Sequence, residues 1–165
     1  MADTATDSAN LLPGIPFVES PLFLELVKDN VFGEHLTAAE HLHQHGFAVV
    51  ELGRERMKRM AGHIKADLED QFDLERWHKG KGITPSRIKD AWKTHKSVKE
   101  LALLPELLQL LKSCWGRHPF GFQTLNFPVG TQQHFHSDAV HFHSEPPGFM
   151  CGIWIPLEDI HPDAG

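Results

Sequence analysis

The hydrophobic pattern of the sequence changes at Gly116. Before it, apolar residues recur every three or four positions, most clearly from Met57 to Phe72, a spacing typical of helices with one buried face. After it, the segments "PFGFQTLNF", "TQQHFHSDAVHF" and "FMCGIWIPLEDI" have strand-like composition and are separated by Pro- and Gly-containing turns. We therefore expect a helical part followed by the start of a β-sheet.

Four helical segments and one early strand are expected before Gly116. The helices fall in residues 21–32, 36–46, 54–72 and 97–116, and the last is a pair whose second member starts at Pro105. Thr37 and Glu40 have the spacing of a capping box, and Gly46 is a plausible helix stop. The apolar, β-branched run at 47–52, "FAVVEL", predicts a buried strand.

The length of 165 residues suits one domain. We expect a flexible polar tail over residues 1–20 and a single domain over 21–165, with its helical part at 21–116 and its sheet core beginning at 117–165. Because strands have begun when the sequence stops at "LEDIHPDAG", unpaired sheet edges are expected. The chain is therefore expected to be a truncated fragment, aggregation-prone on its own.

Charge and cysteine content exclude several classes. Sixteen Lys and Arg against 22 Asp and Glu give a net charge of −6, which argues against nucleic-acid binding. The two Cys form no CxxC motif, which favours a reducing, cytoplasmic setting over a disulfide framework. No apolar run is long enough for a membrane span.

Histidine is unusually abundant, with 13 residues. His136 and Asp138 are two apart in a strand-like segment, so a strand would place both on one face. Two His and one carboxylate form the facial triad of non-haem Fe(II) oxygenases. The pattern alone is weak, because about one His-x-Asp pair is expected by chance and a second pair, His161 and Asp163, occurs in the terminal turn.

The other candidate site residues have simpler structural explanations. His134 is a possible ligand or pocket wall, while His141 and His143 are expected at a pocket edge or in solvent. His41 and His45, four apart on a helix, are read as a solvated helix face that could also share a metal. By default Trp154 is a sheet-core aromatic, and Gln123 is a polar strand residue.

An ordered set of motifs covers the second half of the chain: "FQTLNFPVG", "QHFHSDAVHFHSEPPG", "GIWIPLED" and "PDAG". This set resembles the phytanoyl-CoA dioxygenase family of Fe(II)/2-oxoglutarate oxygenases. The segments "HLHQHGFAVVEL" and "IKDAWKTHKSVKELALLPELL" are similar to the family's opening and middle regions. The resemblance covers most of the chain after about residue 36.

The resemblance implies an α+β protein with a double-stranded β-helix (jelly-roll, cupin-like) core and helices packed outside. It implies Fe(II) held by His136 and Asp138, with 2-oxoglutarate and O₂ as cosubstrates. Gln123 and Trp154 match positions near 2-oxoglutarate, and Phe142 matches a substrate-contacting aromatic. The reaction would couple decarboxylation of 2-oxoglutarate to hydroxylation of a small organic or acyl substrate.

The family also supplies a second iron His and a basic 2-oxoglutarate anchor from strands that this sequence does not include. The 165-residue chain is therefore expected to bind iron weakly and, on its own, to turn over poorly or be inactive. One alternative is a His-rich structural module that holds Zn²⁺ or Ni²⁺ through residues 134–143 and is not an enzyme. Another is a cupin-like enzyme with three His ligands, including His134, and no need for 2-oxoglutarate.

Overall fold

A computed structural model describes residues 12–72, 87–128, 136, 138 and 141–164. The chain divides into two compact units. The first comprises residues 1–50, 105–120 and 136–152, and the second comprises residues 51–104, 121–135 and 153–165.

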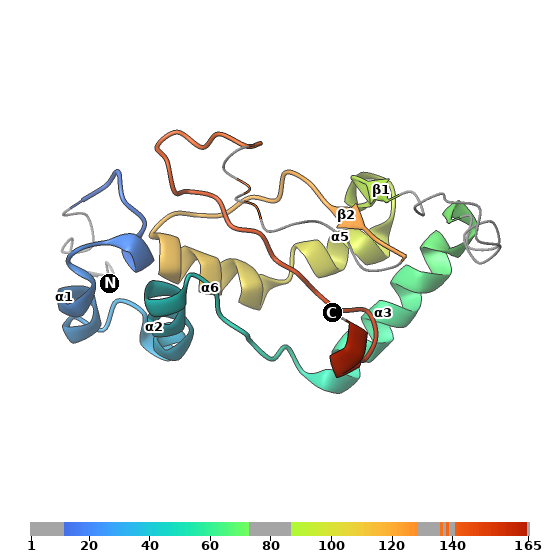
Figure 1. The fold of residues 1–165 in the computed structure, drawn as a ribbon, viewed down its shortest axis with the longest axis horizontal. Coiled ribbons are helices and arrows are strands. Elements are labelled where there is room, and N and C mark those ends of the chain that lie inside the picture. The colour runs from blue at the N-terminus through green and yellow to red at the C-terminus, as the bar shows by residue number, and fades with distance from the viewer. Residues whose placement is uncertain (1–11, 73–86, 129–135, 137, 139–140, 165) are drawn as a thin grey trace, which may run out of the picture. The chain divides into compact units, whose positions relative to one another are not determined.

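The first unit is built from three α-helices: α1 (Phe23–Lys28), α2 (Leu36–His45) and α6 (Pro105–Trp115) (Figure 1). Two 3₁₀ turns, Phe17–Glu19 and Gly33–His35, contact these helices. Its core gathers the side chains that are almost fully excluded from solvent, namely Val18, Phe23, Leu26, Phe32, Ala39 and Cys114.

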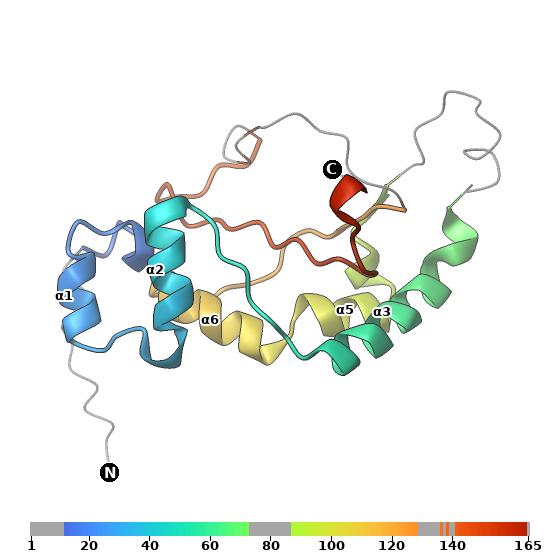
Figure 2. The same cartoon turned by 60° about the horizontal axis from the view of Figure 1, so that its bottom comes forward.

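The second unit contains α3 (Arg54–Leu68) and α5 (Lys96–Ala102), which contact one another (Figure 2). Short 3₁₀ turns lie at Glu69–Gln71, Ala91–Lys93 and Pro162–Ala164. Strands β1 (Ile88–Lys89) and β2 (Leu125–Asn126) pair antiparallel, with Ile88 opposite Asn126. The buried apolar residues of this unit are Ala61, Ile64, Leu68, Ala91, Val98, Leu101 and Leu104.

The predicted helices are confirmed, because each expected segment contains one. On α3, Ile64 and Leu68 are buried as the periodicity predicts. Helix α2 ends at Gly46, whose φ of 77° is left-handed, a conformation that costs glycine little. Helix α6 starts at Pro105 as predicted.

Two local predictions are wrong. The N-cap of α2 is His35 and makes no side-chain capping bond, so Thr37 and Glu40 form no capping box. Residues 47–52 are not a strand, and Val49 is 85% exposed. A strand needs a partner for its backbone groups, and none of the described residues pairs with this run.

The expected sheet after Gly116 is also largely missing from the described residues. In the described parts of 117–164, β2 is the one strand, and its partner β1 comes from the preceding part of the chain. The structure is therefore a mixed helical fold with a small antiparallel pair. A jelly-roll is not formed by these residues.

Packing begins before the expected domain boundary at residue 21. Val18 and Ser20 are each 4% exposed, and Ser20 Oγ accepts a hydrogen bond from the Leu22 N–H at 3.1 Å. Among the described residues, no helix has both the length and the apolar character needed to cross a membrane.

Candidate functional site

His136 and Asp138 lie side by side in the first unit. His136 Nε2 is 3.5 Å from Asp138 Oδ1, and their side chains are 37% and 49% exposed. Two donors that each bind one metal ion at about 2.0–2.2 Å lie about 3–3.5 Å from each other. The pair therefore fits a divalent metal that accepts one imidazole and one carboxylate ligand.

The backbone at Asp138 forms a turn, so the strand argument for this pair is wrong. The Asp138 carbonyl accepts hydrogen bonds from the N–H groups of His141 and Phe142, both at 2.9 Å. Side-chain alternation along a strand therefore does not account for the contact between the imidazole and the carboxylate.

Gly152 contacts the carboxylate of Asp138 from a later part of the chain. A Cβ at position 152 would lie 3.2 Å from Asp138 Oδ2, closer than an ordinary van der Waals contact. One carboxylate oxygen therefore faces His136, and the other lies against the Gly152 backbone. No local sequence pattern indicates this glycine, because its proximity to Asp138 depends on tertiary structure.

The segment between Asp138 and Gly152 is attached to the end of α6. The Trp115 indole Nε1–H donates to the Gly148 carbonyl at 2.9 Å. The Arg117 guanidinium lies over the Phe149 ring, 4.0 Å from its centroid. These contacts fix the loop that follows the candidate metal ligands.

The remaining residues of the His-rich run do not complete a metal site in the described structure. The His141 ring centroid is 6.1 Å from that of His136, and His143 is exposed. Among the described residues, no group of three His, Cys, Asp or Glu side chains is arranged to hold a metal ion. His134 lies outside the described residues.

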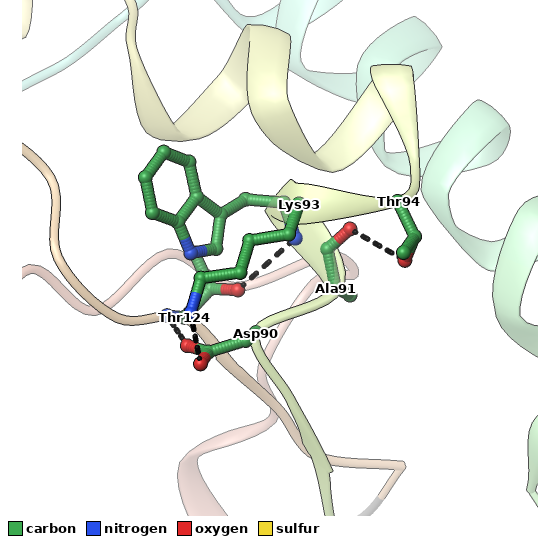
Figure 3. Close-up of polar contacts among 6 residues, drawn as sticks. Asp90, Ala91, Lys93, Thr94 and Thr124 are labelled. Atoms are coloured by element: carbon green, nitrogen blue, oxygen red, sulfur yellow. Dashed lines mark hydrogen bonds and ion pairs between the residues drawn. The ribbon is translucent and has the colours of Figure 1, made fainter.

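Phe142 and Gln123 are each partly exposed. Phe142 follows the turn at Asp138, to whose carbonyl its N–H donates. Gln123 belongs to the second unit and immediately precedes Thr124, which is fixed by Asp90 (Figure 3).

Asp90 anchors the segment that carries Gln123 and leads into β2. Its backbone N–H donates to the Thr124 carbonyl at 2.7 Å, and its Oδ1 accepts from the Thr124 N–H at 3.4 Å. Its Oδ2 accepts from Lys93 Nζ at 2.8 Å (Figure 3). Asp90 adopts a left-handed conformation, with φ of 60°, which Asp tolerates better than most residues. The sequence analysis missed this residue.

The contact with Lys93 lowers the pKa of the Asp90 carboxyl below its ordinary value, and the Thr124 N–H adds to this effect. Two buried polar atoms near this strand have no hydrogen-bond partner within the described structure: Trp92 Nε1 and Asn126 Oδ1. Bound water or a polar ligand normally satisfies such atoms.

Trp154 is 68% exposed, so the default reading of a sheet-core aromatic is wrong. The segment after it is connected to α3 by two exposed ion pairs, Lys65 to Glu158 at 2.7 Å and Arg54 to Asp159 at 3.5 Å. Exposed pairs of this kind contribute about 1 kcal/mol or less each.

The second His-x-Asp motif is also a contact pair. His161 Nδ1 is 3.2 Å from Asp163 Oδ2, and the side chains are 76% and 91% exposed. The Asp163 N–H donates to His161 Nδ1 at 3.2 Å, so this nitrogen is already occupied. The motif therefore does not by itself distinguish a metal site from a surface turn.

A comparison with protein families supports the resemblance seen in the motifs independently. The family model for phytanoyl-CoA dioxygenase (PhyH) matches residues 42–165, which is well over half of the chain. The chain belongs to the phytanoyl-CoA dioxygenase family, a family of oxygenases. Searches of curated proteins and of solved structures gave no match.

Proposed function

We propose that the protein is an Fe(II)/2-oxoglutarate-dependent hydroxylase in which His136 and Asp138 are two of the iron ligands. The observation that carries the proposal is their 3.5 Å separation within the part of the chain that matches the dioxygenase family. Imidazole and carboxylate are the two ligand types of the oxygenase facial triad.

The two ligands have different roles. His136 supplies a nitrogen donor through Nε2, and Asp138 supplies a negative oxygen donor through Oδ1. Because both side chains are partly exposed, iron and its cosubstrates can reach them from solvent. When bound there, iron supplies the chemistry that couples 2-oxoglutarate decarboxylation by O₂ to hydroxylation.

The remaining residues orient the reactants in this proposal. Gln123 and Trp154 contribute to the 2-oxoglutarate site, and Phe142 contacts a small organic or acyl substrate. Asp90 supports Gln123 by fixing the backbone of Thr124. The membership in a dioxygenase family favours this function over a structural metal module.

The test is an anaerobic titration with Fe(II) and 2-oxoglutarate, followed by the weak visible charge-transfer band of the chelate. Because the described residues bring together two candidate ligands and no third, the band should be weak in the unmodified chain, and it should be lost in His136→Ala and in Asp138→Ala. The matched controls are His161→Ala and Asp163→Ala, which remove the same residue types from the other His-x-Asp pair and should keep the band.

A structural metal module predicts a different pattern. It would bind Zn²⁺ without 2-oxoglutarate and lose the metal equally in His141→Ala and His143→Ala. No chelate band in the unmodified chain, combined with that Zn²⁺ result, would overturn the oxygenase proposal.

A further inference from the structure

Helix α2 carries three His residues, and the structure separates them into two kinds. His43 contacts the core although the residue is exposed: its ring stacks on Phe23 with centroids 4.0 Å apart, and its Nδ1–H donates to the Val18 carbonyl at 2.8 Å. His41 and His45 lie on the exposed side of the helix, with ring centroids 4.5 Å apart. Packing explains His43 and leaves the other two without a function.

We propose that His41 and His45 together chelate a borderline divalent transition-metal ion such as Zn²⁺. Residues four apart on a helix are neighbours on its surface, and two His with this spacing form the metal-binding pair of a familiar zinc motif. Two imidazoles on one metal ion, at about 2.0–2.1 Å from each nitrogen, have ring centroids about 5 Å apart. The observed separation needs little rearrangement to meet this geometry.

The hydrogen bond at His41 selects the nitrogen that binds metal. His41 Nδ1 is 2.6 Å from the Phe47 carbonyl oxygen, and a carbonyl can only accept, so Nδ1 carries the proton. In the neutral ring, Nε2 then holds the lone pair. A ligating His typically donates its other ring N–H to such an acceptor, which fixes its tautomer and orientation.

Phe47 further restricts the pair. Gly46 turns the chain at the end of α2. The centroid of the Phe47 ring then lies 4.9 Å from that of the His41 ring and 6.2 Å from that of the His45 ring. His45 lies in the last turn of the ten-residue helix, where the helix dipole favours a cation. Solvent would supply the remaining ligands of the ion.

The test is a calorimetric titration of the full chain with Zn²⁺, in a His136→Ala/Asp138→Ala background that removes the candidate iron ligands. His41→Asn and His45→Asn should each weaken Zn²⁺ binding at least about ten-fold, because each leaves a single imidazole. His45→Cys should retain binding, since thiolate also ligates zinc.

The matched control is His118→Asn, which removes an exposed His outside the pair and should change the affinity less than two-fold. His45 makes no hydrogen bond that its replacement would break among those found in the described structure, so His45→Asn should keep the far-UV circular dichroism of the folded chain. An affinity for Zn²⁺ that is unchanged in a folded His45→Asn variant would overturn the proposal.

Discussion

Individual side chains in this protein acquire their roles from their surroundings rather than from their residue type. The two cysteines illustrate this. Cys114 is fully buried in the core of the first unit, and this burial, together with nearby Cys151, raises the pKa of its thiol to about 12. Cys151 is exposed.

Burial should make the two thiols differ in reactivity. Desolvation also raises the pKa of the exposed Cys151 thiol above its ordinary value. At pH 8 the rapid phase, from Cys151, should therefore be slower than that of a free cysteine, and Cys114 should react only after unfolding, because the thiolate is the nucleophile. The count of thiols before and after denaturation checks this. Cys151→Ser should remove the rapid phase, and a rapid phase that persists in that variant would contradict the assignment.

The contact between Gly152 and Asp138 gives a second residue-scale prediction. Gly152→Ala would place a methyl group 3.2 Å from Asp138 Oδ2, so the carboxylate must move slightly. If Asp138 is a ligand, Fe(II) affinity should fall several-fold with little loss of stability, as measured by paired metal titration and urea unfolding. Unchanged Fe(II) affinity would show that Gly152 does not position the carboxylate.

At the level of whole helices, the residue that follows α6, Gly116, must be glycine both because of its backbone conformation and because of its packing. Gly116 has a φ of 70°, and a Cβ there would lie 2.5 Å from Phe17 Cζ. Gly46, at the end of α2, has a similar φ of 77° but open space around it. Comparing alanine substitutions at these two glycines therefore distinguishes the free-energy cost of backbone strain from the cost of a steric clash.

Gly116→Ala should destabilise the first unit by about 2–4 kcal/mol, since it adds a steric clash with an aromatic ring to the strain of left-handed backbone. Gly46→Ala, the control, should cost about 1 kcal/mol, because only the backbone strain applies. Urea unfolding measures both. Equal costs would show that Phe17 does not limit the substitution.

The β1–β2 pair depends on the carboxylate of Asp90. The lowered pKa of Asp90 means that its contribution to stability is present above the ordinary value of 3.8 and is lost as the pH falls through the lower value in the folded state. Asp90→Asn keeps a residue that tolerates the left-handed conformation but removes the charge that faces Lys93.

Asp90→Asn should therefore lower the unfolding midpoint in urea at pH 7, and its difference from the unmodified chain should shrink as the pH is lowered to about 3. Asp90→Ala should lower the midpoint further at pH 7, because alanine neither accepts these hydrogen bonds nor tolerates the backbone conformation. A difference that grows at low pH would contradict the role given to the carboxylate.

For the molecule as a whole, local patterns predicted the helices, but among the described residues they predicted one strand correctly, β2, which lies within the expected segment 119–127. The burial of Ile64 and Leu68 and the end of α2 at Gly46 follow from nearby sequence. Strand pairing depends on distant residues: Asp90 pairs with Thr124, 34 positions later, and no local pattern indicates this. The exposed Val49 shows the converse, since strand propensity without a partner forms no strand.

The candidate site was predictable to a similar extent. The resemblance selected His136 and Asp138 from 13 His and many acidic residues, and the structure holds them 3.5 Å apart. The expected strand at this position is a turn instead, and the contact with Gly152 depends on tertiary structure. Their role as iron ligands, and the roles of Gln123, Trp154 and Phe142, stay predictions.

The central claim is that His136 and Asp138 act together as metal ligands. Mn²⁺ tests it most directly, because it suits carboxylate and imidazole donors and its free form is counted by electron paramagnetic resonance. In the presence of 2-oxoglutarate we expect one Mn²⁺ site, whose affinity falls at least about ten-fold in both His136→Ala and Asp138→Ala, but not in His41→Asn/His45→Asn. Affinity that is unchanged in either of the first two variants would contradict it.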